Sequence, residues 1–133
     1  MSAKEKNRIM SMFDKAKLSV HISEEDGKIQ AEFTPAADFP PFHGHFPGNP
    51  ILPGIAQISL ITEILNRACG SGFILETVKR VKFLAPALPE KCLSVEVTSR
   101  PGETEGSVAV EAVLRTDGKK ISVLKLHYRR TAA

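Results

Sequence analysis

One long helical segment, set between segments of strand pattern, constrains the fold of this chain most. Residues 54–69 carry apolar side chains at helical spacing, with Pro53 suited to the first turn and Gly70 to the C-terminal stop. A single apolar helix cannot be buried in a bundle, so a sheet must wrap around it. Alternating apolar and polar residues predict the strands of that sheet within 17–22, 29–33 and about 74–84, 91–99, 106–116 and 119–129.

Turn signals and the pattern of the helix refine this architecture. Asp26-Gly27 and Asp117-Gly118 predict two hairpins. On the helix, the polar positions share one face: Ser59, Thr62, Glu63, Asn66 and Arg67. The opposite, apolar face is expected at Ile55, Ile58, Ile61, Leu65 and Ala68. We therefore expect an α+β hot-dog fold, with an antiparallel sheet of about six strands wrapped around one long central helix. A single domain is expected over 1–133, with a short N-terminal helix within 1–14.

Composition argues against several classes of function. The net charge is +3, and the basic residues are scattered without interleaved aromatic rings, so we expect no nucleic-acid binding. The apolar run 51–65 is too short to span a bilayer and is interrupted by polar residues. No secretory signal pattern is visible, and Cys69 and Cys92 are not spaced as a metal or redox motif. These features predict a cytoplasmic protein with reduced thiols.

The loop before the helix carries the densest chemistry. It runs Phe42-His-Gly-His45-Phe-Pro-Gly-Asn-Pro-Ile-Leu-Pro-Gly54. His45 is a titratable imidazole close to a helix start, where backbone N–H groups are unpaired. Such a base beside such donors is what proton abstraction next to a carbonyl requires. His43 and His45 are also spaced as a metal pair, but no carboxylate or cysteine stands at ligand spacing nearby, so no metal site is expected.

The run His45-Phe-Pro-Gly-x-Pro-x-x-Pro-Gly54 resembles the motif of the 3-hydroxyacyl-(acyl carrier protein) dehydratases of fatty acid synthesis. The preceding Phe42-x-Gly44 and the later Arg80-Val-Lys-Phe-x-x-Pro-x-x-Pro89 fit the same pattern. Residues 52–57 are closer to a divergent branch, found in aryl-polyene and related lipid-like pathways. The resemblance extends from about Leu18 to the C-terminus.

This resemblance implies a hydro-lyase that eliminates water from a 3-hydroxyacyl thioester to give a trans-2-enoyl thioester. It implies a homodimer or higher homo-oligomer, with active sites at the subunit interface and no metal or redox cofactor. The acyl chain would arrive on the phosphopantetheine of an acyl carrier protein. His45 would remove the α-proton, and the Gly54 N–H would stabilise charge on the thioester oxygen. Phe46 and Gly48 would lie beside the substrate, the ring at the tunnel mouth and the glycine shaping the loop.

One position departs from the family pattern. The acid of the family, Glu or Asp, lies fourteen residues after the loop histidine, and this chain has Ser59 there. A serine hydroxyl can orient water or a substrate hydroxyl but is a poor proton donor at neutral pH. Glu63 lies one turn further on the same face and is the candidate replacement acid. The alternative is that Glu63 forms a structural ion pair with Arg67 at i, i+4.

Two other functions remain open. A hot-dog acyl thioesterase would use Glu63 to activate water for thioester hydrolysis. A non-catalytic or half-site subunit would keep the His45 loop and bind acyl carrier protein, while a different chain in a heterodimer supplies the acid. Measured thiol release, or activity that requires a second chain, distinguishes these from dehydration.

Overall fold

The computed structural model describes residue 13 and residues 17–22, 28–42, 51–70 and 72–131. Its elements, in chain order, are β1 (Lys17–Ile22), β2 (Ile29–Thr34), the 3-10 turn η1 (Pro40–Phe42), α2 (Gly54–Cys69), β3 (Phe73–Phe83), β4 (Leu93–Pro101), β5 (Ser107–Thr116) and β6 (Lys119–Arg130). The predicted helix 54–69 is confirmed, and each later strand begins and ends within two residues of its predicted bounds. None of the described helices is long and apolar enough to cross a membrane.

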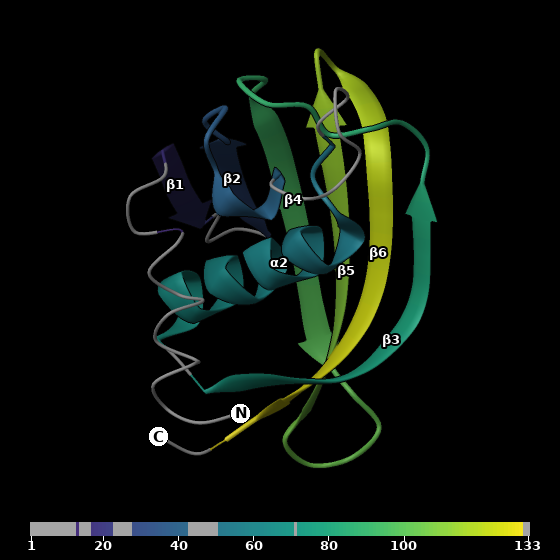
Figure 1. Cartoon of the computed structure of the whole chain (residues 1–133). Coiled ribbons are helices and arrows are strands. Elements are labelled where there is room, and N and C mark those ends of the chain that lie inside the picture. The colour runs from purple at the N-terminus through teal and green to yellow at the C-terminus, as the bar shows by residue number, and fades with distance from the viewer. Residues whose placement is uncertain (1–12, 14–16, 23–27, 43–50, 71, 132–133) are drawn as a thin grey trace.

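The strands form one antiparallel sheet in the order β1-β2-β4-β5-β6-β3. The sheet curves around α2, with β1 at one edge and β3 at the other (Figure 1). The predicted architecture of six antiparallel strands around one helix is therefore confirmed. The β5–β6 hairpin turns at Asp117 and Gly118, whose φ angles of 53° and 78° are those of a tight type I′ turn.

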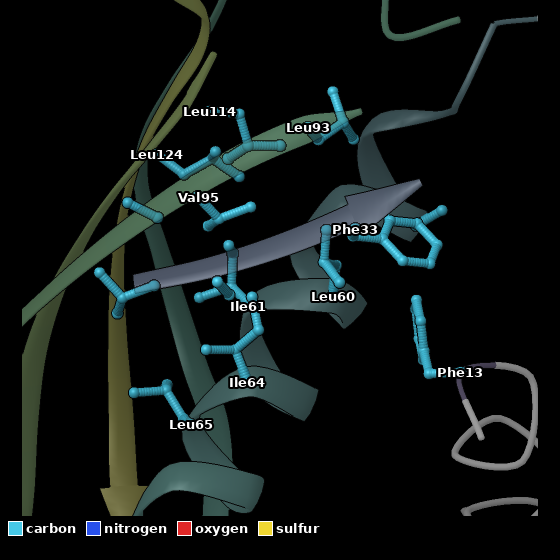
Figure 2. Close-up of a cluster of buried hydrophobic side chains, with 14 of the residues drawn as sticks. Phe13, Phe33, Leu60, Ile61, Ile64, Leu65, Leu93, Val95, Leu114 and Leu124 are labelled. Atoms are coloured by element: carbon cyan, nitrogen blue, oxygen red, sulfur yellow. The ribbon is translucent and has the colours of Figure 1, made fainter. Parts of the chain in front are cut away.

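The core lies between α2 and the concave face of the sheet (Figure 2). Alternation supplies the sheet's contribution, because every second residue of a strand points to the same face. The fully buried side chains around the helix are Leu60, Ile61, Ile64 and Leu65 from α2, and Leu93, Val95, Leu114 and Leu124 from β4, β5 and β6. Burying a side chain of this size contributes about 1.5–3 kcal/mol, so this layer dominates the stability.

A cluster of aromatic rings closes one end of this core. Phe13, Phe33 and Phe39 lie with ring centroids 5.4–5.7 Å apart at steep interplanar angles. Phe13 has helical backbone and is buried. The rest of the helix predicted within 1–14 lies outside the described residues, as does the Asp26-Gly27 turn. The single-domain organisation over 1–133 stays a prediction.

The predicted apolar face of the helix is wrong at Ile55. This side chain is 72% exposed, whereas the buried face includes Leu60 and Ile64. Ile55 precedes Ser59 by four residues and Thr62 by seven, so helical spacing places it on the polar face of α2 and away from the buried Ala56 and Gln57 of the same turn. The polar face is also more buried than a solvated face would be, since Glu63 is among the buried residues.

Candidate active site

The start of α2 is held in place by a short chain of hydrogen bonds. Leu52 N–H donates to the Ala87 carbonyl at 2.8 Å. The Gln57 side-chain amide donates to the Leu52 carbonyl at 3.2 Å, and its oxygen accepts from the Ser122 hydroxyl of β6 at 2.6 Å. Gln57 is only 2% exposed, so these bonds form in a low-dielectric interior where they are strong. They tie the end of the loop and the first turn of the helix to the sheet.

Backbone donors are available at this helix start. Pro53 has an extended backbone and its carbonyl accepts from Ala56 and Gln57, but no side chain caps the helix. Within the described part of the chain, the N–H groups of Gly54 and Ile55 have no recorded acceptor. The helix dipole adds partial positive charge at this point. The arrangement suits an oxygen that develops negative charge, which is the role predicted for Gly54.

Gly54 also lies against the end of β3. A Cβ built at Gly54 would come 2.6 Å from the tip of the Phe83 ring, closer than side chains approach one another. Phe83 itself is 53% exposed, so the ring forms an apolar wall beside the helix start. The glycine therefore allows Phe83 to cover the first turn of α2. Gly54 and Phe83 belong to the two segments on which the family resemblance rests, and the fold brings them together.

Glu63 is the most unusual side chain on α2. It is 5% exposed, and Oε1 accepts a hydrogen bond from Arg67 Nε at 2.7 Å. This is the i, i+4 ion pair that the sequence offered as the structural alternative. Its second oxygen, Oε2, is buried and has no hydrogen-bond partner among the described residues. A buried carboxylate oxygen without a partner is costly, and native structures keep few of them.

The neighbours of Glu63 on this face are polar. Ser59, one turn earlier, is half-buried, and its hydroxyl has no recorded partner in the described part of the chain. Thr62 shares a 2.8 Å hydrogen bond with the Tyr128 hydroxyl of β6 and also donates to the Ile58 carbonyl. Burial raises the pKa of Tyr128 to about 12, so the phenol is neutral at physiological pH. The face thus offers a hydroxyl and a carboxylate about 6 Å apart along the helix axis.

Three of the predicted site residues lie outside the described part of the chain. These are His45, Phe46 and Gly48. Their assignments as base, tunnel residue and loop residue stay predictions, as do the roles of Gly54, Ser59 and Glu63. Among the described residues, no group of three or more His, Cys, Asp or Glu side chains is arranged to hold a metal ion.

The structure adds supporting residues that sequence reasoning did not assign. Gln57, Ser122 and Ala87 hold the helix start, and Tyr128 bonds to the polar face of α2. Gln57 had a weak signal, because it interrupts an otherwise apolar run at a position that faces the core. Ser122 and Tyr128 had none beyond strand alternation, since their partners are more than sixty residues away in sequence.

Comparison with known proteins finds a family. A model of that family, described as ApeI-like and representing the ApeI dehydratase, matches residues 21–122. The 3-hydroxyacyl-(acyl-carrier-protein) dehydratase FabZ of Neisseria meningitidis serogroup C is 33% identical over 99 residues, covering 56% of this chain and 64% of the relative. The FabZ of Geobacter metallireducens is 36% identical over 73 residues, covering 45% of this chain and 46% of the relative. The chain thus spans less than two thirds of the length of these curated relatives.

Solved structures confirm the hot-dog fold. The dehydratase heterocomplex ApeI:P from Xenorhabdus doucetiae aligns with a TM-score of 0.67 at 22% identity, covering 86% of this chain and 99% of the other. The PaaI protein of the phenylacetic acid degradation operon of E. coli aligns with a TM-score of 0.68 at 16% identity, covering 96% and 94%. At these identities the likeness shows the fold alone.

Proposed function

The chain belongs to the ApeI-like dehydratase family, and from this membership we propose that it eliminates water from a 3-hydroxyacyl thioester. The observation that carries the proposal is the extent of the family match. It includes the His45 loop, helix α2 and the Arg80–Pro89 segment together, rather than one isolated motif.

In the proposed reaction, His45 takes the proton from the carbon next to the thioester carbonyl. The electron pair of that C–H bond forms the C2–C3 double bond as the C3–O bond breaks. The leaving hydroxide takes up a proton from the carboxyl group of Glu63, the proposed acid, and departs as water, and the product is a trans-2-enoyl thioester. Negative charge that develops on the thioester oxygen is stabilised by the Gly54 N–H at the start of α2.

Glu63 is the proposed partner of His45 in place of the family's acid. Its buried Oε2 has no partner among the described residues and is the oxygen proposed to carry the proton, whereas Oε1 accepts a hydrogen bond from Arg67. The Arg67 contact fixes the direction of the carboxyl group, so Oε2 is preorganised to bind the 3-hydroxyl and to manage its proton. Ser59 is assigned a supporting role as a hydrogen-bond partner of the substrate, because a hydroxyl is a weak acid.

We assign the substrate to an acyl carrier protein, with the acyl chain on its phosphopantetheine arm, and expect no metal or redox cofactor. The chemistry needs only a base, an acid and an oxyanion donor, all of which side chains and backbone can supply. The reaction is assigned to the cytoplasm, within fatty acid synthesis or a related lipid or polyene pathway.

A second copy of the chain is the proposed partner at the β3 edge. Strand β3 ends the described sheet order, so one of its sides has no neighbouring strand there. The exposed large apolar side chains gather on or near this strand and the helix start: Ile55, Ile74, Val78, Phe83, Leu84 and Leu88. An unpaired apolar edge is a strong candidate for strand pairing, and the pairing would bring two helix starts to one interface.

Hydration of a trans-2-enoyl thioester, the reverse reaction, tests the proposed activity. The purified protein is expected to remove the ultraviolet absorbance of the conjugated thioester without releasing free thiol. His45→Ala is expected to lower the rate about 10²–10⁴-fold, the range typical for loss of a general base. His21→Ala, at an exposed position of β1, is the matched control and should retain the rate.

Glu63→Gln tests the assignment of the acid separately. This variant keeps the size of the side chain and the acceptor for Arg67 but removes the carboxylate. The expected result is a loss of at least about tenfold in rate, with Glu32→Gln as the exposed control. An unchanged rate in Glu63→Gln rejects Glu63 as the acid while leaving the dehydratase proposal in place. Thiol release by the unmodified protein rejects dehydration in favour of thioester hydrolysis.

The presence of Ser59 at the family's acid position favours one second candidate, a half-site subunit. In that case this chain supplies the His45 loop to a heterodimer whose other chain supplies the acid. The structurally similar ApeI:P dehydratase of Xenorhabdus doucetiae is itself a heterocomplex, which motivates the test. Hydration that appears only when a second hot-dog chain is added, and that survives Glu63→Gln, favours this candidate.

A further inference from the structure

A hollow lies on the outer face of the sheet, away from α2 and the candidate active site. Its volume is about 210 Å³. Strands β3, β4, β5 and β6 each contribute to its lining, which consists of Lys79, Thr98, Arg100, Ala109, Val110, Glu111, Lys125 and His127. Four of these eight residues are Lys, Arg or His, although the net charge of the whole chain is only +3. The proposed dehydratase reaction uses none of them.

The register of the sheet explains how these side chains meet. Arg100, Ala109 and His127 are direct cross-strand neighbours on β4, β5 and β6. Glu111 and Lys125 lie in the next row on the same face. The methyl group of Ala109 is short, so the space between the Arg100 and His127 side chains stays open.

A bulge in β3 brings a third cation to this hollow. Val78 pairs with Leu126 and Arg80 with Lys125, so Lys79 is an extra residue between two paired positions. Bulges of this kind redirect a side chain, and Lys79 lines the hollow. The bulge and the small residue at 109 are independent features, and both shape the same depression.

The charges of this group are not neutralised by ion pairs. In the described part of the chain, the ion pairs involve none of Lys79, Arg100, Lys125 and Glu111. Apart from His127, three cations and one carboxylate leave two positive charges at the depression. A concave surface with one sign of charge concentrates its field and attracts the opposite ion.

We propose that this hollow, which we call the outer-face site, binds a phosphate-type dianion. Arg100 offers a fork of N–H donors that matches phosphate oxygens, and the two lysines add point charges. The volume is smaller than the roughly 300–1,000 Å³ of sites for drug-sized ligands, so it suits a phosphate or diphosphate group rather than a large molecule. The Glu111 carboxylate weakens anion binding by repulsion. Its removal should therefore strengthen binding, whereas removal of a cation should weaken it.

Titration of the full chain with inorganic phosphate and pyrophosphate, at constant ionic strength set with chloride, tests the site. Amide shifts in nitrogen-15 spectra should move at Arg100, Ala109 and His127, and pyrophosphate should bind more tightly than phosphate. Arg100→Gln is expected to weaken binding about three- to tenfold, and Glu111→Gln to strengthen it about two- to fivefold. Lys119→Gln, an exposed cation on the β5–β6 hairpin, is the matched control and should change binding less than twofold.

The opposite effects of Arg100→Gln and Glu111→Gln distinguish a built site from general charge. Equal weakening by Arg100→Gln and Lys119→Gln, or shifts spread over the whole surface, overturns the proposal.

Vesicles of phosphatidic acid and of phosphatidylcholine identify the source of the phosphate group. Binding of phosphatidic acid vesicles through Arg100 assigns a lipid headgroup, whereas pyrophosphate binding without vesicle binding assigns a soluble phosphate ester. Binding of an acidic protein with no response to either phosphate probe rejects the dianion.

Discussion

Helix α2 presents two faces to the rest of the molecule, and they are buried in different ways. The face toward the sheet packs Leu60, Ile61 and Ile64 against strand side chains, and Gln57, a buried polar side chain on this face, is hydrogen-bonded to the Leu52 carbonyl and to Ser122. The other face carries Thr62 and Glu63, which are hydrogen-bonded to Tyr128 and Arg67. One atom is left over there, Glu63 Oε2, buried and without a partner among the described residues.

This difference indicates that the sheet side of α2 contributes mainly to stability and the polar side mainly to function. Apolar burial has no direction and is satisfied by close packing alone, so the apolar side chains on the sheet side of α2 need only shape and volume. Polar burial needs a specific partner for each group, so an unmatched atom indicates either a cost or a use. The polar face of α2 is therefore where a ligand gains most from binding, and the apolar face is where a substitution costs most in folding.

The largest loss of stability is expected on the sheet side, from Ile64→Ala. Ile64 is fully buried, so its truncation leaves a cavity and should lower the free energy of unfolding by about 2–5 kcal/mol. Ile55→Ala, on the same helix but 72% exposed, is the matched control and should cost less than about 0.5 kcal/mol. Urea denaturation measures both, and similar losses would show that the first turn of α2 is covered in solution.

A smaller loss is expected from Gln57→Leu, which removes the link between the helix start and β6. Ser122 loses its acceptor and the Leu52 carbonyl loses a donor, so the variant should be about 1–3 kcal/mol less stable. Because Ser122→Ala removes one of the same bonds, the double variant should lose less than the sum of the two single losses. Strict additivity in urea denaturation contradicts the shared bond.

Tyr128→Phe tests the hydrogen bond that joins the polar face of α2 to the sheet. Loss of the phenol group should cost about 1 kcal/mol at neutral pH. The pKa of Tyr128 is raised from 10.0 to about 12, so the folded state keeps the proton longer than the unfolded state. The stability from this group is therefore fully present below pH 10 and lost as the pH rises from 10 to 12.

The Tyr128→Phe variant separates the loss of stability caused by deprotonation of Tyr128 from any loss caused by deprotonation of lysines at alkaline pH. The unmodified protein should lose about 2–3 kcal/mol more than Tyr128→Phe between pH 9 and pH 12. Thermal unfolding of both proteins across this range measures the difference. Parallel curves would mean that the phenol is as accessible to water when folded as when unfolded.

The smallest loss of stability is expected from Glu63→Gln, the variant proposed to impair activity. Glutamine keeps an acceptor for Arg67, and Arg67 is partly exposed, so the change should stay below about 1 kcal/mol. Little loss of stability together with a large loss of enoyl hydration supports a functional role for this face. A loss above about 2 kcal/mol would instead assign Glu63 to the structure.

Local sequence patterns predicted the helix and strand bounds well, but they predicted the burial of individual side chains less well. The helix 54–69, the strands and the Asp117-Gly118 turn follow from periodicity and turn chemistry, which depend on neighbours in sequence. Ile55 was assigned to the wrong face, because its apolar side chain outweighed its helical spacing, which places it in line with Ser59 and Thr62. The positions of His45, Phe46 and Gly48 stay predictions, since they lie outside the described residues.

The amino-acid sequence by itself determined one long helix among antiparallel strands, and a motif from His45 to Gly54 dense enough to indicate the family. Both rest on local spacing. Only the tertiary structure decided that Gln57 and Ser122 hold the helix start, that Phe83 lies against Gly54, and that Glu63 keeps an unmatched oxygen. The outer-face site also came from the tertiary structure, through strand register and a bulge. These contacts form between residues that are distant in sequence, and local sequence patterns do not predict which distant residues come into contact.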